Sequence, residues 1–394
     1  GIDSGAFPGA QVMVLKNQKV IFHETYGHHT YAQARRVQPD DVYDLASVTK
    51  ISSALAGLMR LHGQGNFDLD APLVDYFPQA KGSNKANLQF REMLSHQARL
   101  RPWIPYWRTT LKGNARYPWQ KRYQSDALNE GRFKPRTFRR DSSARFPTYV
   151  TDDLWLHRNY RQRIYKAILK SPLQEKREYV YSGLLFYLLP EIVANITGED
   201  YETYLKSALY HPLGAFSITY NPWRFYPKER IIPTEQDTFF RQALLHGRVH
   251  DEGAAMMAGL SANAGLFANA NDLAKLLQLY LNEGQYGGEQ LIAATSVQEF
   301  RQRHYAADGN RRGIGFDKPL LEYDPVKSSV AEAASSESFG HSGYTGTFVW
   351  VDPAEDLIFI FLSNRVHPTR DNRYIYTLNI RPRIHSAIYQ AIEK

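Results

Sequence analysis

The sequence predicts an α+β fold in which the two ends of the chain build one antiparallel sheet. Apolar runs rich in β-branched and aromatic residues lie near both termini, at Gln11–Leu15, Lys19–Glu24, Thr347–Asp352 and Leu357–Leu362, and such runs are typical of strands. Helical spacing prevails between them. This order favours a sheet with flanking helices beside a mainly helical region. A chain of 394 residues, 43% of them hydrophobic, is long enough to bury such a core.

Turn residues join the strands of each terminal pair. Lys16–Gln18, with Asn17 at its centre, separates the first two strands, and Pro353–Asp356 separates the last two. Asn, Pro and Asp favour the backbone angles of tight turns. We therefore expect two antiparallel hairpins.

One helix is expected to follow a strand directly. Val42–Leu45 is predicted as a strand, and Ser47–His62 has apolar residues at helical spacing until Gly63 and Gly65 end the pattern. The other predicted helices are Asp152–Leu169, Ser182–Thr197, Asn271–Leu281 and a terminal helix from about Ile380 to Lys394. These elements divide one domain into a sheet region, residues 1–75 and 240–394, and a helical region, residues 76–239.

The positive charge of the chain is concentrated in one segment. The chain has 48 Lys and Arg against 40 Asp and Glu, a net charge of +8, whereas residues 101–150 alone hold 12 basic and 3 acidic residues. This basic, aromatic-rich stretch has weak periodicity, so we predict an insertion at about residues 99–150 of the helical region. It lacks the pattern of any nucleic-acid-binding module, and we expect no nucleic-acid partner.

The composition excludes several classes of site. There is no cysteine, which excludes disulfides, a thiolate nucleophile and Cys-ligated zinc. No run of 18 apolar residues occurs, so no membrane span is expected. Because the chain opens on Gly1 rather than Met, we interpret it as an excised domain, whose sequence does not report on targeting.

Ser47-Val48-Thr49-Lys50 is the first candidate for chemistry. Residues three apart share a helix face, so Lys50 is expected beside the Ser47 hydroxyl. A serine hydroxyl is a weak nucleophile until a base takes its proton, and a lysine amine can be that base where burial favours its neutral form. An N-capping serine with a solvated lysine is the alternative. The position of the motif, at a helix start after a strand, favours the chemical interpretation.

Two further motifs contain candidate site residues. In Tyr181-Ser182, a tyrosine near a lysine ammonium can act as a general acid or base; a helix start capped by Ser182 is the alternative. His341-Ser342-Gly343 precedes Tyr344 and a strand. Small residues at a strand edge let a substrate approach backbone N–H groups, whereas an ordinary Gly-rich turn is the alternative.

His246 and His250 have the spacing of metal ligands on a helix and precede Asp251 and Glu252. No third ligand is evident, so a hydrogen-bonded structural role is favoured over a metal site. We predict neither a metal nor another cofactor.

In this order and at these separations, the three motifs resemble the signatures of the serine β-lactamase and penicillin-binding-protein superfamily, on its class C side, which are S-x-x-K, Y-x-N and K-T-G or H-x-G. The resemblance runs nearly from end to end and includes Asp44–Ala46, Phe67–Pro72, His250–Glu252 and Ala264–Phe267. Through Tyr181–Gly183, Arg311–Pro319 and Leu362–Arg365 the chain is most similar to β-lactamase-like domains that follow a family-three glycoside hydrolase domain in Bacteroidetes proteins. The resemblance implies the β-lactamase/transpeptidase-like fold.

The resemblance also implies a mechanism through an acyl-enzyme. Ser47 would attack a carbonyl, while Lys50 and Tyr181 would move protons. The backbone N–H groups of Ser47 and Tyr344 would form an oxyanion hole. His341, Ser342 and Gly343 would line the substrate-binding wall opposite. The family further implies a periplasmic or otherwise extracytoplasmic location, and the closer match implies a fused or associated glycoside hydrolase domain.

Two departures from the family pattern bear on the substrate. The asparagine of Y-x-N is Gly183, and the lysine of K-T-G is His341, which is mostly neutral at pH 7. Both argue against efficient hydrolysis of β-lactams and against D,D-carboxypeptidase activity. We predict a serine hydrolase of the esterase or D-aminopeptidase type that acts on an ester or amide, with cell-wall-derived peptides among the candidates. The alternative is a penicillin-binding or sensor module without turnover.

The basic insertion is predicted to form a lid or wall beside Ser47. Its aromatic side chains would supply apolar surface and its arginines would meet an anionic substrate group. The residues concerned are Trp103, Tyr106, Trp107 and Trp119, with Arg101 and Arg108. A surface insertion packed by its own aromatics is the alternative.

Overall fold

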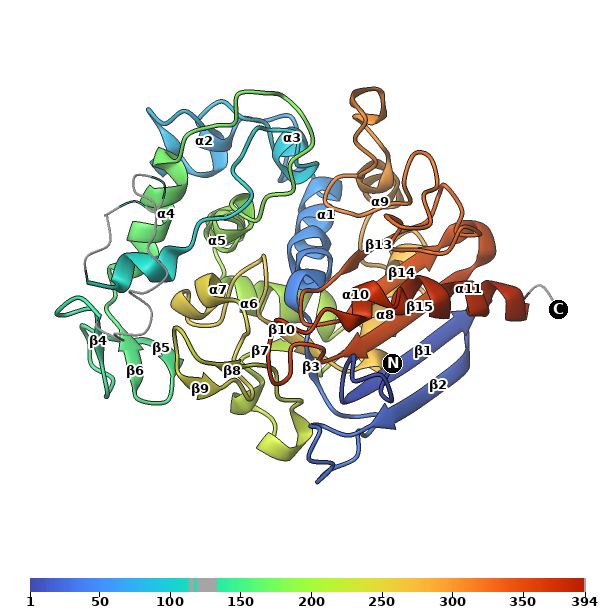
Figure 1. Ribbon diagram of the computed structural model, residues 1–394. Coiled ribbons are helices and arrows are strands. Elements are labelled where there is room, and N and C mark those ends of the chain that lie inside the picture. Colours follow the sequence, from blue (N-terminus) through green and yellow to red (C-terminus); the bar gives the residue numbers. More distant parts are fainter. Residues whose placement is uncertain (113–116, 118, 120–132, 393–394) are drawn as a thin grey trace.

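Both ends of the chain meet in a five-stranded antiparallel sheet of order β13-β14-β15-β1-β2 (Figure 1). The computed structural model describes residues 1–112, 117, 119 and 133–392. The strands are β1 (Gly9–Lys16), β2 (Lys19–Gly27), β13 (Phe339–Ser342), β14 (Phe348–Asp352) and β15 (Leu357–Ser363). The first and last strands lie side by side because β1 pairs with β15. The sheet built from both chain ends and its two hairpins are therefore confirmed.

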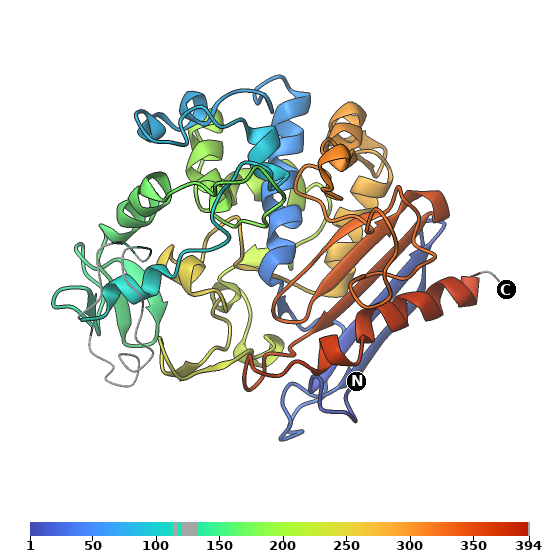
Figure 2. The same ribbon diagram turned by 45° about the horizontal axis from the view of Figure 1, so that its top comes forward.

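Both faces of this sheet are covered, which explains the nearly continuous apolar runs of its strands. Successive side chains of a strand point to opposite faces. In β15, Ile358 and Ile360 join the large core, whereas Phe359 and Phe361 join a second core. Helix α8 (Ala270–Leu281) lies on the first face, and α11 (Ile380–Ile392) covers the second together with the short α10 (Tyr374–Thr377) (Figure 2).

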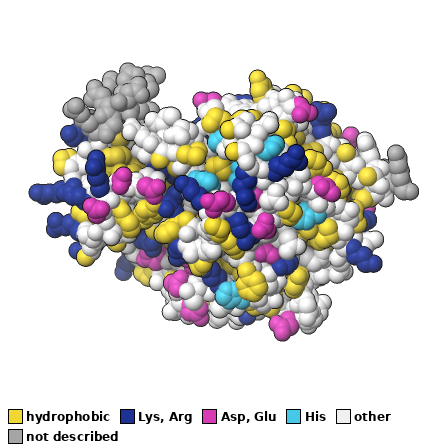
Figure 3. Space-filling view, turned by 90° about the horizontal axis from the view of Figure 1, so that it is seen from below, with side chains coloured by type: hydrophobic (Ala, Val, Ile, Leu, Met, Phe, Trp, Pro, Cys, Tyr) yellow, Lys and Arg dark blue, Asp and Glu magenta, His cyan; other side chains and the backbone are white. Residues whose placement is uncertain are grey.

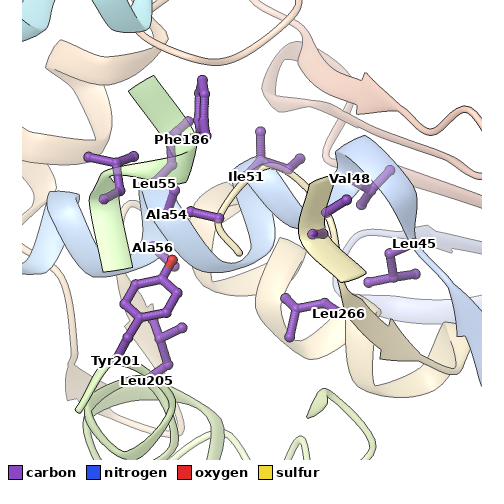
Figure 4. Close-up of a cluster of buried hydrophobic side chains, with 14 of the residues drawn as sticks. Leu45, Val48, Ile51, Ala54, Leu55, Ala56, Phe186, Tyr201, Leu205 and Leu266 are labelled. Atoms are coloured by element: carbon purple, nitrogen blue, oxygen red, sulfur yellow. The ribbon is translucent and has the colours of Figure 1, made fainter. Parts of the chain in front are cut away.

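The central helix forms the middle of the large core. It comprises a 3₁₀ turn at Ala46–Val48, a π-helical segment at Lys50–Leu55 and α1 (Ala56–Gly63). Its apolar residues are almost wholly buried and pack against the helical region and β10 (Leu266–Ala268) (Figure 4). The remaining helices are α2 (Leu73–Tyr76), α3 (Phe90–Leu94), α4 (Tyr160–Lys170), α5 (Leu189–Thr197), α6 (Tyr201–Leu205), α7 (Glu252–Met256) and α9 (Ala294–Arg301). No described helix is long and apolar enough to span a bilayer.

Short strands complete the fold. β3 (Tyr43–Asp44) pairs with β10, which also pairs with β7 (Thr219–Tyr220). A second three-stranded sheet, of order β4-β6-β5, is built by residues 138–156, at the end of the predicted insertion and just after it. Its strands are β4 (Phe138–Arg139), β5 (Thr148–Thr151) and β6 (Leu154–Leu156). The two-stranded pairs are β8 (Gln236–Asp237) with β9 (Ala243–Leu244), and β11 (Gln285–Tyr286) with β12 (Glu289–Gln290).

Two predicted helices begin later than their sequence pattern indicates. The helix expected at Asp152–Leu169 starts at Tyr160, because the chain turns at Asp153, where φ is +59°, and continues as β6. The segment expected to be a helix at Ser182–Thr197 begins with a 3₁₀ turn at Leu185–Tyr187 and becomes α-helical only in α5, at Leu189. Before this turn, the Ser182 hydroxyl donates to the Arg101 carbonyl and accepts from the Leu184 N–H, which holds the chain in a turn.

Exposed basic side chains from the predicted insertion and from the segment that follows it, including helix α4, share one surface. Exposed arginines and lysines gather at the end of the molecule that carries β4, β5 and β6 (Figure 3). They are Arg136, Arg139, Arg140, Arg145, Arg158, Arg161, Arg163, Lys166 and Lys170. Because these side chains are exposed, their charges stay hydrated and none of them has to be buried in the core.

Candidate active site

Ser47 and Lys50 are paired at the start of the central helix. The Lys50 Nζ atom donates to Ser47 Oγ at 3.0 Å and to the backbone carbonyl oxygen of Asn263 at 3.0 Å. Lys50 is only 2% exposed. The arrangement follows from the spacing of the two residues and contradicts the alternative of a solvated lysine.

A strained turn delivers Ser47 from strand β3 to the helix. Ala46 has a φ of +46°, which is rare for a residue with a side chain. The buried Asp44 carboxylate holds this turn, because it accepts from the N–H of Ala46 at 2.8 Å and from that of His250 at 2.6 Å. Burial raises the pKa of Asp44, although these two N–H groups act in the opposite direction. Ser47 is thus presented on a fixed backbone.

Tyr181 lies between Lys50 and the wall formed by His341. The centre of its ring is 5.3 Å from Lys50 Nζ, 4.6 Å from the His96 ring and 6.0 Å from the His341 ring. Burial acts to raise the pKa of Tyr181, but the charges of Lys50 and Arg312 and the approach of the Ser47 side chain outweigh it. The pKa of the Tyr181 hydroxyl is therefore below its ordinary value of 10.0, which favours a proton-accepting phenolate.

His341 is a neutral residue on β13. It is 2% exposed, and burial together with the charges of Arg312 and Lys50 lowers its pKa to about 3. Its Nδ1 lies 2.8 Å from the Ser342 carbonyl oxygen, and its Nε2 lies 3.5 Å from Nη1 of Arg312. Since a guanidinium can only donate, Nε2 is the acceptor and Nδ1 carries the hydrogen.

The loop after β13 is fastened to the backbone that precedes Ser47. The Thr345 hydroxyl donates to the Asp44 carbonyl at 2.7 Å, and the Thr347 hydroxyl donates to the Leu45 carbonyl at 2.9 Å. Gly343 packs so closely that a Cβ atom there would lie 2.5 Å from the Leu45 carbonyl oxygen. Only glycine allows this approach.

Two backbone N–H groups are left free where the loop and the helix start meet. Within the described part of the chain, the N–H groups of Ser47 and Tyr344 have no hydrogen-bond acceptor. Unpaired N–H groups beside a nucleophile can donate hydrogen bonds to an oxyanion, as in an oxyanion hole. Tyr344 itself is 43% exposed, so its side chain stands at the mouth of the site.

Comparison with known proteins identifies the fold and the family. A family model described as beta-lactamase matches residues 1–380. The chain belongs to the beta-lactamase family. The predicted resemblance to the serine β-lactamase superfamily and the β-lactamase/transpeptidase-like fold are thereby confirmed. The closer similarity to domains that follow a glycoside hydrolase domain stays a prediction.

Similar proteins include carboxypeptidase-like relatives. A protein of Escherichia coli O157:H7 named "Putative D-alanyl-D-alanine carboxypeptidase" is 25% identical over 393 residues, which cover 93% of this chain and 80% of that protein. A protein of the same name from Salmonella typhimurium strain LT2 is 25% identical over 395 residues, with the same coverage of both chains.

Solved structures share the fold of this beta-lactamase family member. EstCE1, a hydrolase with promiscuous acyltransferase activity, superimposes with a TM-score of 0.66 at 18% identity and covers 98% of this chain and 95% of its own. A class C beta-lactamase from Rhodobacter sphaeroides superimposes with a TM-score of 0.61 at 18% identity, covering 97% and 96%.

The structure shows what replaces the family asparagine at Gly183. A Cβ atom at Gly183 would meet only the Cβ of Asn263, at 4.0 Å. Asn263 presents its backbone carbonyl to Lys50, while its side-chain Nδ2 donates to the Tyr187 hydroxyl at 3.2 Å. Asn263 therefore helps to hold Lys50 through its backbone carbonyl.

Asn263 and Arg312 are site residues that sequence reasoning did not assign. Both lie in or beside stretches that carry the family resemblance, Ala264–Phe267 and Arg311–Pro319. Their positions next to these stretches were the available signal. Their partners Lys50 and Tyr181 lie more than 100 residues away in the chain, so no local pattern could reveal the contacts.

His246 and His250 bind different partners. His246 Nε2 lies 2.6 Å from the Ile231 carbonyl oxygen, and His250 Nε2 lies 3.0 Å from the Glu235 carboxylate. Among the residues that the structure describes, no group of three His, Asp or Glu side chains is arranged to hold a metal ion. The structural role favoured for both histidines agrees with these contacts.

Part of the predicted insertion borders the site, but Tyr106 and Trp107 are buried and do not supply the predicted apolar surface. The Arg101 and Pro102 carbonyls accept hydrogen bonds from Ser182 and Gly183, next to Tyr181. Trp103 is 50% exposed.

The other aromatic residues of the insertion pack inside the protein. Tyr106 and Trp107 are 2% and 3% exposed, so they belong to the core. Trp119 stacks on Tyr117, and Arg108 lies over the Trp107 ring. Residues 113–116, 118 and 120–132 of the predicted lid lie outside the described residues.

Proposed function

We propose that this protein is a serine hydrolase that forms an acyl-enzyme on Ser47 from an ester or amide. The observation that carries the proposal is the buried Lys50 ammonium, 3.0 Å from Ser47 Oγ, beside a tyrosine whose pKa is lowered. A serine becomes a nucleophile when a neighbouring base takes its proton. A tyrosine whose pKa is lowered by a neighbouring lysine is suited to that role.

The reaction would proceed in two steps. Ser47 Oγ attacks the substrate carbonyl while Tyr181, supported by Lys50, takes the proton and later gives it to the leaving group. The N–H groups of Ser47 and Tyr344 would receive the oxyanion. Water then attacks the acyl-serine, and the same pair of residues returns the proton to Ser47.

The wall of the site that His341 forms, opposite Ser47, favours substrates without a carboxylate beside the scissile bond. His341 is neutral with a pKa of about 3, so it cannot bind a carboxylate as a lysine does. The relatives named as putative D-alanyl-D-alanine carboxypeptidases support an amide bond as the target, although their substrates by name end in a carboxylate. We therefore propose neutral acyl esters or amides, uncharged cell-wall peptides included, as the substrate class. An extracytoplasmic location and a glycoside hydrolase partner domain stay predictions of the family resemblance.

The test is the hydrolysis of p-nitrophenyl acetate and of a D-amino-acid amide by Ser47→Ala. We expect kcat/KM to fall by about 10³-fold or more. Ser52→Ala is the matched control, because Ser52 is a buried serine of the same helix whose hydroxyl has no partner among the described residues. Equal rates for Ser47→Ala and the wild type would refute the mechanism.

The second candidate is a penicillin-binding or sensor module without turnover. Gly183 favours it, because the side-chain amide that would hold a substrate is missing there. Mass spectrometry after incubation with a fluorophosphonate or with penicillin separates the two candidates. A stable adduct on Ser47 without turnover of any ester or amide would support the sensor.

A further inference from the structure

A positive charge stands directly behind the neutral His341. Arg312 is 5% exposed and lies on the loop between α9 and β13. Its Nη1 is 3.5 Å from His341 Nε2, and its Cζ is 4.9 Å from the centre of the Tyr181 ring. The site that lacks the lysine of K-T-G therefore does not lack its charge.

Several contacts hold the Arg312 guanidinium in place. Its Nε donates to the Tyr179 hydroxyl at 2.9 Å, and its Nη2 lies 3.4 Å from the Asp317 carboxylate. The backbone N–H of Arg312 donates to the side-chain oxygen of the fully buried Asn310 at 3.0 Å, which fixes the backbone that carries the guanidinium. A planar, multiply bonded guanidinium is a fixed charge, because it is always protonated and its rotamer is locked.

We propose that Arg312 is the positioning residue that replaces the third-motif lysine, by providing a fixed positive charge that stabilises the Tyr181 phenolate. The inference rests on the proposed function, since it assigns a role to Tyr181 as the proton acceptor. Arg312 acts through Tyr181 and His341 and does not contact the substrate. With its nitrogens bonded within the protein and little exposed surface, it is unsuited to binding a substrate carboxylate.

The charges around Tyr181 leave a positive excess. Lys50 faces it from the central helix, Arg312 from the loop before β13, His341 from β13 and His96 from the loop after α3. Burial lowers the pKa of His96 well below its ordinary value and that of His341 to about 3, so both rings are neutral at pH 7.

The nearby acidic group does not cancel this excess. Asp317 pairs with Arg311 at 2.9 and 3.1 Å and with Arg312 only at 3.4 Å. One carboxylate is thus shared by two arginines. Together with Lys50, the cluster keeps a net positive charge beside Tyr181 that favours its ionised form.

The experiment compares pH profiles of kcat/KM for p-nitrophenyl acetate in the wild type, R312M, R312K and the double variant R312M/H341K. A direct titration of tyrosinate by ultraviolet difference absorbance, with Y181F as the reference, measures the same group without turnover. Arg311→Met is the nearby control, because it removes a charge that contacts Asp317 and lies over Tyr179 rather than Tyr181.

We expect R312M to shift the acid limb and the tyrosinate midpoint to higher pH by about one unit or more. R312K should keep most of the wild-type profile, and the lysine of R312M/H341K should restore it. Arg311→Met should move the midpoint much less. Unchanged midpoints in R312M would overturn the proposal, as would a loss that neither lysine variant rescues.

The design separates this proposal from the proposed function. If wild-type protein neither hydrolyses the ester nor is acylated at Ser47, the proposed function fails. The tyrosinate titration would still decide whether Arg312 controls Tyr181. If R312M does not fold, R312K and the double variant still test whether a charge at either position is sufficient.

Discussion

The Thr347 hydroxyl donates a hydrogen bond of 2.9 Å to the carbonyl oxygen of Leu45, which lies 302 residues earlier in the chain. This bond joins the start of strand β14 to the backbone two residues before Ser47. It thereby sets the distance between the two free N–H groups, of Ser47 and Tyr344, that would receive an oxyanion. The geometry of the site thus depends on the contact between the two ends of the chain.

Gly343→Ala should disrupt this contact. The new Cβ would collide with the Thr347 hydroxyl and lie 2.5 Å from the Leu45 carbonyl oxygen. The loop would move, and we expect kcat/KM to fall by about 10²–10³-fold through loss of the Tyr344 donor. Overpacking should also lower the free energy of unfolding by about 1–3 kcal/mol. Ester hydrolysis and urea denaturation measure the two effects.

Gly183→Ala is the matched control for stability. Its Cβ would meet only Asn263, at an ordinary contact distance of 4.0 Å, so the free energy of unfolding should change by less than about 0.5 kcal/mol. An equal loss of stability in both variants would show that the close approach of Gly343 to Leu45 is unimportant.

Lys50→Met should separate stability from activity. The Lys50 ammonium is buried and, within the described part of the chain, forms hydrogen bonds to Ser47 and Asn263 but no ion pair. Burying a charge costs free energy that an apolar side chain of similar length does not. We expect kcat/KM to fall by about 10²–10⁴-fold, while Tm stays at the wild-type value or rises. A marked fall in Tm would mean that Lys50 holds the fold together.

Buried histidines should make the protein unstable in acid. Burial lowers the pKa of His385 from 6.5 to about 3, despite the nearby Asp352. The unfolded chain then binds a proton that the folded chain does not. Stability therefore falls as the pH drops from 6.5 toward 3, by about 1.4 kcal/mol per pH unit for each such histidine. His341, with the same pKa, adds to this slope.

His385→Gln tests this slope away from the active site. His385 lies on the buried face of α11 and stacks on Phe359, and its Nδ1 accepts from the Ala331 N–H at 3.3 Å. Urea denaturation at several pH values between about 6 and about 4 should show the slope reduced by about 1.4 kcal/mol per pH unit. His211→Gln, at an exposed histidine, should leave it unchanged. An unaltered slope in His385→Gln would contradict the assignment.

The hairpin turns and the pairing of Ser47 with Lys50 were predictable because their causes are local. Asn17 and Gln18 both have positive φ, as a two-residue hairpin turn requires. Asp356, in the turn of the second hairpin, also has positive φ. The pairing of Ser47 with Lys50 follows from helical spacing alone. Such features need no knowledge of the rest of the chain.

Features with distant causes were not predictable in this way. Strand β6 forms because Leu154–Leu156 pairs with β4 and β5, although the segment resembles the start of a helix. Arg312 and Tyr181 meet only because the loop before β13 packs against the segment that follows residue 170. Tertiary contacts of this kind override local preference, and a single sequence carries no signal for them.

Position 183 has room for a side chain. Since a Cβ there would touch only Asn263, at 4.0 Å, Gly183→Asn should be accommodated. Its amide would lie beside Lys50 and could bond a substrate carbonyl, and one such bond is worth about 1 kcal/mol. We expect the rate at which penicillin acylates Ser47, measured by mass spectrometry, to rise by about fivefold to tenfold. Gly183→Ala supplies the control without an amide. If neither variant differs from the wild type, the missing asparagine does not limit reactivity toward β-lactams.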